Sequence, residues 1–342
     1  MALTRRRALL ALSLAGVGWG CGASRAAPLE VVSEIRAFPR GTGDAEKKSI
    51  IVFMPDTVQT REVWQSLSDE LREDFNLVPI EVPAGASADL LARAMNDIRP
   101  VCVVLMNNPT LAAYRSFQAA TPKGQPFPPA VIVMAAFLEH QYGSIRNATG
   151  ISYELPAVMV FSKLRALLSS QIRRVGTIHR PGFAGFARRQ AELAASENIT
   201  LIGVEVDASP RVAELKWALR ELRSQVDAIW VQNDNVLLTP ELISGAWISE
   251  LHRRPRLPTI VGAAPLVSPE HSFGTFAMLP DHTALGVQAA GLVFDLAEAE
   301  WQITEPGVQM PLSTVTIMDL VQTQAFFELT PGAVDRVDKV LR

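Results

Sequence analysis

The chain has 342 residues, of which 48% are hydrophobic and 20% are charged, and its formal net charge at pH 7 is −3. This length is sufficient for two lobes of ordinary domain size. The weakly acidic charge argues against a nucleic-acid-binding protein, and no apolar run reaches the roughly 20 residues that a membrane-spanning helix needs.

Residues 1–26 have the features of a secretory signal. Arg5-Arg6-Arg7 is a positive n-region, Ala8–Val17 is a short apolar stretch, and Ala23-Ser24-Arg25-Ala26 offers small residues for cleavage after Ala26. Cleavage would remove four arginines and no acidic residue, which lowers the formal charge from −3 to −7. We therefore expect an exported protein located in the periplasm.

Two details of the signal leave alternatives open. The paired arginines after Thr4 resemble a Tat signal, so both Sec and Tat export are compatible with the sequence. Cys21 is a candidate for lipidation, but Gly18-Trp19-Gly20 is a poor lipobox, which makes a lipid anchor the less favoured alternative. Cys102 lies in the middle of an apolar run and is interpreted as a buried small hydrophobe without a disulfide.

Beyond a polar leader, short apolar runs alternate with amphipathic segments. Runs of four to six apolar residues are typical of strands buried on both faces, as in a parallel sheet. Pro79 within one of these runs indicates an edge strand. The first set has predicted strands at 50–54, 77–82, 101–106 and 131–134, and predicted helices at 61–73, 87–98 and 111–120.

Asn147–Ser152 interrupts this rhythm and is interpreted as a segment that crosses to a second set. That set has predicted helices at 156–171, 183–197, 212–225 and 240–253, and strands at 175–179, 200–206, 228–231 and 259–261. The remaining expected elements are a strand at 273–278, a helix at 283–300 capped by Asp281, a strand at 313–318, and short helices at 320–327 and 334–341.

The pattern predicts an α/β protein with two Rossmann-like lobes, each a parallel sheet with helices on both faces. Residues 48–150 plus 273–300 are assigned to the first lobe, and 155–268 plus 307–342 to the second. Because ligands bind at the carboxyl ends of parallel strands, the polar loops that follow the strands are the expected site.

Several segments resemble the substrate-binding proteins of ABC transporters, in particular the tryptophan/tyrosine-type group. The segments are Ala148–Ser152, Asp227–Val231 with Asp234-Asn235, Asp281–Gln288, and Ala333–Val340. The resemblance implies a type I periplasmic-binding-protein fold whose lobes close on a ligand about a three-strand hinge, near 149–154, 268–273 and 301–306. It also implies delivery of the ligand to a membrane permease driven by an ATPase; we expect a monomer.

Two departures from that group concern the ligand. Relatives carry an Asp-Pro pair after the fourth strand, where this chain has Ala135-Ala136-Phe137-Leu138-Glu139-His140. After the strand that ends at His179, relatives have small polar residues, whereas this chain has Arg180-Pro181-Gly182-Phe183. These differences argue against an aromatic amino acid as the ligand, and favour a small polar molecule, with amino-acid-like compounds among the candidates.

The loop residues supply candidate ligand contacts. We expect Asp234 to pair with a ligand ammonium, Arg180 to hold a ligand carboxylate by two hydrogen bonds, and Phe137 and Phe183 to stack on the ligand. Asn and Asp are also common turn residues for backbone reasons alone, which is the alternative reading. Asp234→Ala is expected to lower affinity at least tenfold. The other candidates are Asp56, Thr57, Asn107, Asn108, Ala135, Ala136, Asn235 and Ala263.

The sequence contains no nucleophile elbow, no Walker-type loop and no dinucleotide-binding fingerprint. Its histidines are scattered without metal-ligand spacing. We therefore expect neither a cofactor nor a metal, and no enzymatic activity. Two alternatives to transport remain: a periplasmic subunit that presents its ligand to a signalling partner, and a secreted enzyme on a doubly wound fold.

Overall fold

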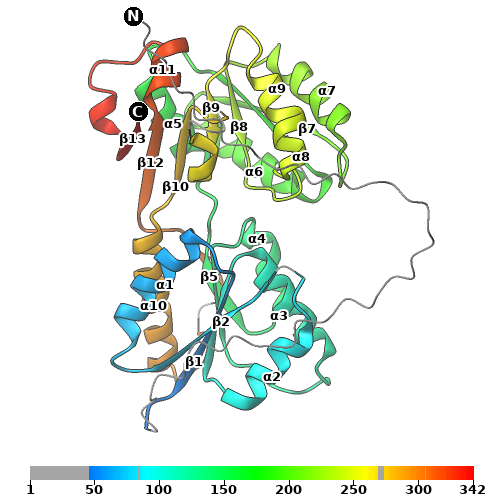
Figure 1. Cartoon of the computed structure of the whole chain (residues 1–342), viewed down its shortest axis with the longest axis vertical. Helices are drawn as coiled ribbons and strands as arrows, with labels where there is room; N and C mark the ends of the chain where they lie inside the picture. Colours follow the sequence, from blue (N-terminus) through cyan, green and yellow to red (C-terminus); the bar gives the residue numbers. More distant parts are fainter. Residues whose placement is uncertain (1–45, 84, 269–272, 305) are drawn as a thin grey trace, which may run out of the picture. The chain divides into compact units, whose positions relative to one another are not determined.

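The computed structural model describes residues 46–83, 85–268, 273–304 and 306–342. The predicted signal sequence, including Cys21, lies outside the described residues, as do residues 269–272 of the expected second hinge segment. Two β-sheets contain the described strands, and Figure 1 shows them as separate groups.

The first sheet is parallel throughout, with strand order β11-β5-β4-β3-β1-β2. β2, which contains Pro79, lies at the edge as predicted, where the missing N–H of proline costs no ladder bond. The strands are β1 (Ser49–Met54), β2 (Asn76–Glu81), β3 (Cys102–Met106), β4 (Ala130–Val133), β5 (Ala148–Ile151) and β11 (Val308–Gln309).

Helices cover both faces of this sheet. Successive residues of its central strands are therefore buried on opposite sides. Ile50 and Val52 of β1 belong to the core formed with α1 and α10, whereas Ile51 and Phe53 belong to the core formed with α2 and α3. Figure 1 shows α1 beside α10 on one side of the strands. The helices are α1 (Val58–Leu71), α2 (Ala88–Ile98), α3 (Asn108–Ala120), the short α4 (Leu138–Gln141) and α10 (His282–Glu298).

The second sheet has strand order β13-β12-β10-β9-β8-β6-β7. Its strands are parallel except that β12 runs antiparallel to β10, with β13 parallel to β12. The strands are β6 (Arg174–His179), β7 (Thr200–Glu205), β8 (Ala228–Val231), β9 (Thr259–Val261), β10 (Phe276–Pro280), β12 (Thr314–Asp319) and β13 (Lys339–Leu341).

Helices again cover both faces of this sheet. Trp230 of β8 packs in the core with α5 and α6, and its neighbour Ile229 packs in the core with α7 and Trp247. The predicted helix 240–253 contains a π-helical turn at Ile243–Trp247. The helices are α5 (Ala157–Leu167), α6 (Ala184–Ala195), α7 (Val212–Arg223), α8 (Pro240–Leu242), α9 (Ile248–Leu251) and α11 (Leu320–Phe326). Short 3₁₀ turns occur at Tyr142–Ser144, Pro181–Phe183, Ala264–Val267 and Val334–Arg336.

The chain passes between the two sheets three times, which confirms the predicted two-lobed α/β fold but corrects the expected boundaries. The passages lie at 152–156, at Asp281 and at 310–313. β10 belongs to the second sheet, so the assignment of 273–300 to the first lobe is wrong at its start. β11 belongs to the first sheet, so the assignment of 307–342 to the second lobe is also wrong at its start. The second and third hinge positions shift accordingly.

The C-terminal segment differs from its prediction. Its apolar spacing favoured a helix at 334–341, but a single 3₁₀ turn is followed by β13. β13 pairs with β12, which places Val340 opposite Met318. The Asp338 carboxylate accepts hydrogen bonds from the backbone and side chain of Thr316, at 2.8 and 2.6 Å. A free sheet edge therefore decides the conformation of this segment over its local periodicity.

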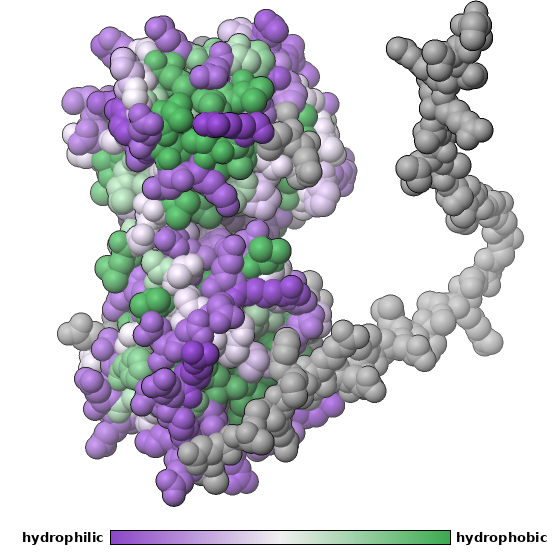
Figure 2. Space-filling model, turned by 60° about the vertical axis from the view of Figure 1, so that its left-hand side comes forward, coloured by the Kyte–Doolittle hydropathy of each residue, from purple (hydrophilic) through white to green (hydrophobic). Residues whose placement is uncertain are grey.

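Within the described ranges, no helix is both long and apolar enough to cross a bilayer. The face seen in Figure 2 mixes hydrophilic and hydrophobic side chains, with one apolar area on the lobe that contains the second sheet. Val321 of α11 is among the exposed apolar side chains of that lobe.

Candidate functional site

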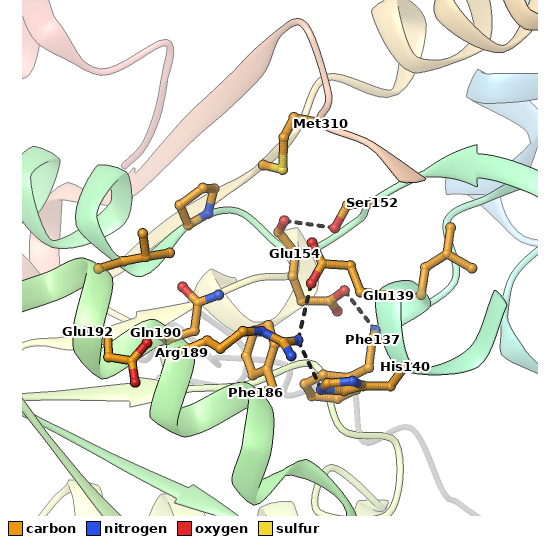
Figure 3. A pocket seen from close by; sticks show the side chains of 13 residues that line it. Phe137, Glu139, His140, Ser152, Glu154, Phe186, Arg189, Gln190, Glu192 and Met310 are labelled. Atoms are coloured by element: carbon orange, nitrogen blue, oxygen red, sulfur yellow. Dashed lines mark hydrogen bonds and ion pairs between the residues drawn. The ribbon is translucent and has the colours of Figure 1, made fainter. Parts of the chain in front are cut away.

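A cavity of about 410 Å³ is lined by residues of both lobes and of two passages between them. Figure 3 shows α4 contributing Glu139 and His140, and α6 contributing Phe186, Arg189 and Gln190. Ser152 and Glu154 come from the first passage, and Met310 from the third. A ligand in this cavity would touch both lobes at once, which is the condition for a ligand to favour one relative arrangement of two lobes.

Aromatic rings from the two lobes meet beside the cavity. Phe137 follows β4 in a left-handed conformation with φ 54°, and its ring stacks on Phe183 with centroids 3.9 Å apart and planes 22° apart. Phe137 and Phe186 meet edge-to-face, with centroids 5.1 Å apart. The two phenylalanines predicted to stack on a ligand thus contact each other, and Phe137 and Phe186 also line the cavity.

Glu154 is the central acidic residue of the site. Its Oε2 accepts a hydrogen bond of 2.7 Å from the backbone N–H of Phe137, and Ser152 Oγ donates to its backbone oxygen at 3.0 Å. The residue is partly accessible, but Oε1 is fully buried and has no partner among the described residues. Burial raises the pKa of Glu154 to about 8, against the lowering effect of the Phe137 N–H. At neutral pH the side chain is therefore mainly a neutral acid.

Glu154 and Phe186 also line a smaller recess of about 20 Å³, together with Gln232 and Asn233 at the end of β8. Gln232 is only 5% exposed. Both of its amide atoms, and Asn233 Oδ1, are buried without a partner among the described residues. Because an unpaired buried polar group costs about 1–3 kcal/mol, such a cluster marks a place where a polar ligand group gains hydrogen bonds without displacing protein partners.

Arg180 and Asp234 pair with each other rather than lying free to hold a ligand. Arg180 Nε and Nη2 donate to the two carboxylate oxygens of Asp234 at 2.6 and 2.9 Å. Asp234 Oδ1 also accepts from the backbone N–H of Val236 at 2.9 Å. The Arg180 guanidinium lies 5.0 Å from the ring centre of Phe183. Neither charged residue lines the cavity or the recess, so their direct ligand contact stays a prediction.

We expect Asp234→Ala to lower the free energy of unfolding by about 2–3 kcal/mol, because it leaves Arg180 without its buried partner. Asp234 is 3% exposed. Asp56→Ala is the matched control, since Asp56 makes the same two-bond pair with Arg61 at 2.6 and 2.7 Å. That pair is on the surface, with side chains 64% and 43% exposed, and its loss should cost below about 1 kcal/mol. Urea unfolding measures both; equal costs would contradict the prediction.

The remaining predicted residues make local contacts. Thr57 caps α1, with reciprocal hydrogen bonds to Thr60. Asn107 caps α3 from a conformation with φ 78°, and Asn108 Oδ1 is buried without a partner among the described residues. Ala135 and Ala136 are buried, Asn235 is exposed, and Ala263 precedes the 3₁₀ turn at 264–267. Of the twelve predicted ligand contacts, only Phe137 lines the cavity.

None of the polar residues that line the cavity or the recess was among the predicted contacts. The segment interpreted as crossing, 147–152, mostly forms β5 of the first sheet, so this interpretation is wrong by a few residues; the passage lies at 152–156 and contains Glu154, which was not proposed as a contact. After β8, Asp234 and Asn235 were chosen although Gln232 and Asn233 line the recess. The position of a residue in its loop could have indicated the better choice. Residues immediately at a strand end lie closer to the neighbouring passage than residues later in the loop.

Searches for related proteins by sequence matched no protein-family profile and no curated protein. Solved structures do match. A protein from Streptococcus pneumonia described as an ABC domain in complex with L-Trp is 15% identical with a TM-score of 0.60. A conserved domain protein from Vibrio cholerae is 17% identical with a TM-score of 0.61, and a ligand-free, open substrate-binding protein from Clostridium difficile is 12% identical with 0.60. Each match covers 86% of this chain and 99% of the other.

The chain has the type I periplasmic-binding-protein fold. In a type I periplasmic-binding-protein fold two α/β lobes are joined by several passages of the chain, as at 152–156, Asp281 and 310–313 here. Among the described residues no group of three or more His, Cys, Asp or Glu side chains is arranged to hold a metal ion.

Proposed function

We propose that the protein is an exported solute-binding protein that captures a small polar molecule between its lobes and delivers it to an ABC-type permease. The observation that carries the proposal is the cavity lined from both lobes, together with the recess that shares Glu154 and Phe186 with it and contains the unpartnered polar atoms of Gln232 and Asn233. The role is binding without a catalytic step, in the periplasm, as a monomer.

The composition of the site supports a ligand with an apolar body and a polar end. Phe137 and Phe186 offer ring surfaces at the cavity. The recess offers the two N–H bonds of Gln232 as donors, and the Gln232 and Asn233 carbonyls as acceptors. Amino-acid-like compounds have this combination of groups, and a similar fold binds L-Trp.

A thermal-shift screen against amino acids, small aromatic carboxylic acids and nucleosides tests the proposal. A ligand present at a hundred times its Kd stabilises the protein by about 2.7 kcal/mol, a shift that is readily measured. Titration calorimetry then gives the affinity and stoichiometry of each hit. The proposal is contradicted if every class of compound leaves the unfolding temperature unchanged.

Gln232→Leu should lower the affinity for the ligand found in that screen at least tenfold while leaving the folded protein as stable as before, or more stable. The reason is that both amide atoms lack protein partners, so an apolar side chain of similar size removes a buried polar group at no cost in hydrogen bonds. Calorimetry measures the affinity and urea unfolding the stability.

Gln118→Leu is the matched control. Gln118 is 2% exposed, donates to Arg146 O at 2.9 Å and accepts from Arg146 N at 2.8 Å. This variant should lose about 1–3 kcal/mol of stability and keep its affinity. A Gln232→Leu protein that binds as tightly as the wild type would remove the recess from the binding site.

A further inference from the structure

A chain of hydrogen bonds joins three segments that are far apart in the sequence. Tyr153, in the first passage between the lobes, has its hydroxyl 3.0 Å from His282 Nε2. His282, the first residue of α10 directly after the second passage, has Nδ1 2.7 Å from Glu62 Oε2. Glu62 belongs to α1. The chain therefore links the first passage to α10, which begins where the second passage ends, and to α1 of the first lobe.

The donors and acceptors in this chain follow from chemistry. A carboxylate accepts hydrogen bonds, so His282 Nδ1 carries the proton and donates to Glu62. When Nδ1 alone carries a proton, Nε2 is an acceptor and the Tyr153 O–H donates to it. Burial, followed by the nearby Glu154 and Glu62, raises the pKa of Tyr153, which keeps the phenol protonated as a donor. His282 is 8% exposed, so water competes little at its ring, whereas the Glu62 side chain is 52% exposed and its end of the chain meets solvent.

The chain bears directly on the ligand site. Tyr153 precedes Glu154, and both line the recess beside Gln232 and Asn233. The Tyr153 and His282 rings lie nearly parallel, with planes 15° apart and centroids 6.1 Å apart. Rotation of the first passage relative to α10 would break the bond between these residues. Holding them together therefore restricts both the orientation of Glu154 and the freedom of the lobes to rotate.

We propose that Tyr153, His282 and Glu62 are positioning residues that restrict the lobe arrangements of the ligand-free protein and so preorganise the cavity. The effect on affinity rests on the proposed ligand-binding function, whereas the restriction of the lobes does not. Preorganisation raises affinity because less ordering is left for the ligand to cause.

The test is a distance distribution between two spin labels, one on each lobe, in the ligand-free protein. Labels replace the exposed Arg93 on α2 and the exposed Glu221 on α7, in a full chain whose two native cysteines are changed to alanine. Tyr153→Phe should broaden the distribution relative to the parent. Tyr142→Phe is the matched control, because its hydroxyl has no hydrogen bond among the described residues, and it should leave the distribution unchanged.

Three further variants separate positioning from a general loss of packing. Glu62→Gln keeps an acceptor for His282 and should behave like the parent, whereas Glu62→Ala should broaden the distribution. In Tyr153→Phe combined with His282→Phe, the broadening should be no greater than in Tyr153→Phe alone. Both changes remove the bond between Tyr153 and His282, and the second bond of His282, to Glu62, restrains the passage only through that first bond. Additive broadening in the double variant would overturn the proposal.

Affinity is measured with each hit of the screen, and L-tryptophan is included as a probe because a protein of similar fold binds it, although the sequence argues against an aromatic ligand here. Tyr153→Phe should weaken binding about five- to tenfold, mainly through faster dissociation, and Tyr142→Phe should not. Unchanged distances in Tyr153→Phe overturn the inference even if the wild type binds ligand. A broadened distribution in a protein that binds none of the compounds upholds the inference and overturns the proposed function instead.

Discussion

Gly286→Ala is expected to lower the free energy of unfolding by about 2–3 kcal/mol, because α10 and α1 touch at this residue without room for a methyl group. A Cβ there would lie 2.0 Å from Ser66 Oγ, 2.4 Å from the Val63 carbonyl oxygen and 2.9 Å from the Leu67 nitrogen. Two of these atoms are backbone atoms of α1 and cannot rotate away. The helices must therefore separate, and overpacking of this kind costs about 1–3 kcal/mol, occasionally more.

Gly291→Ala provides the control within the same helix. A Cβ at Gly291 would meet nothing within 4 Å, so the change removes backbone freedom from the unfolded chain without a clash. We expect it to raise the free energy of unfolding by about 0.5–1 kcal/mol. Urea unfolding compares both variants with the wild type, with one m-value (the slope of the unfolding free energy against urea concentration) shared by all three proteins. Stabilisation by Gly286→Ala would show that α1 and α10 are not in this close contact.

Gly286→Ala should also disturb the chain Glu62–His282–Tyr153, because Glu62 directly precedes Val63 and His282 lies one helical turn before Gly286. Moving α10 away from α1 lengthens the hydrogen bond between His282 and Glu62. The variant should therefore combine lower stability with weaker ligand binding, whereas Gly291→Ala should leave binding unchanged.

Glu154→Gln is expected to change how stability depends on pH. The pKa of Glu154 is raised by burial to about 8 in the folded protein, from an ordinary value of 4.5. The folded state therefore binds more protons than the unfolded state between these two values, and the stability of the wild type falls as pH rises through that window. Glutamine keeps the size and an acceptor oxygen but does not ionise, so this fall should disappear in the variant.

The size of the effect follows from the pKa difference. Each pH unit between the folded and unfolded pKa corresponds to about 1.4 kcal/mol. The residue is partly accessible, which discounts the full value. We expect the stability of Glu154→Gln relative to the wild type to increase by about 2–4 kcal/mol between pH 5 and pH 9. Urea unfolding at pH 5, 7 and 9 measures it, and a constant difference would contradict the raised pKa.

Glu250→Gln is a control of opposite sign. Burial acts to raise the pKa of Glu250, but hydrogen bonds from Arg220 and Arg253 outweigh it and leave the pKa lowered. Its contribution to stability is present at neutral pH and is lost as the pH falls through the lowered pKa. The cost of Glu250→Gln should thus shrink as the pH falls through the lowered pKa, whereas the stability of Glu154→Gln relative to the wild type changes between about pH 4.5 and pH 8.

Local pattern determined most of the elements because it reports burial directly. Ile50–Phe53 are apolar at every position, and such a run is stable only in a strand covered on both faces, as β1 is. The same reasoning placed the cap at Asp281, whose side chain accepts hydrogen bonds from the backbone N–H groups of Thr283 and Ala284. Strand burial patterns and helix caps depend on residues only a few positions apart, so they can be predicted from the sequence.

The ligand contacts were harder to predict than the strands and helices. The polar residue types that bind ligands also form ion pairs, turns and helix caps within the protein. Arg180 and Asp234 are chemically suited to hold a carboxylate and an ammonium, and for the same reason they suit each other. Nothing in the spacing of residues 54 positions apart decides whether they meet. Asn107 and Thr57 had the turn and cap roles that compete with ligand binding for such residues.

The sequence by itself determined the two α/β sets, because these depend on short-range periodicity, and it predicts an export signal from the charge and apolar run of residues 1–26. Only the tertiary structure decided which sheet β10, β11 and β13 join, that Glu154 is buried with one oxygen unpartnered, and that Glu62, Tyr153 and His282 meet. The physical reason is that burial of a polar group, and hydrogen bonds between distant segments, are properties of the packed chain: the pKa of Glu154 and the partner of Tyr153 come into existence only when the lobes and their passages are assembled.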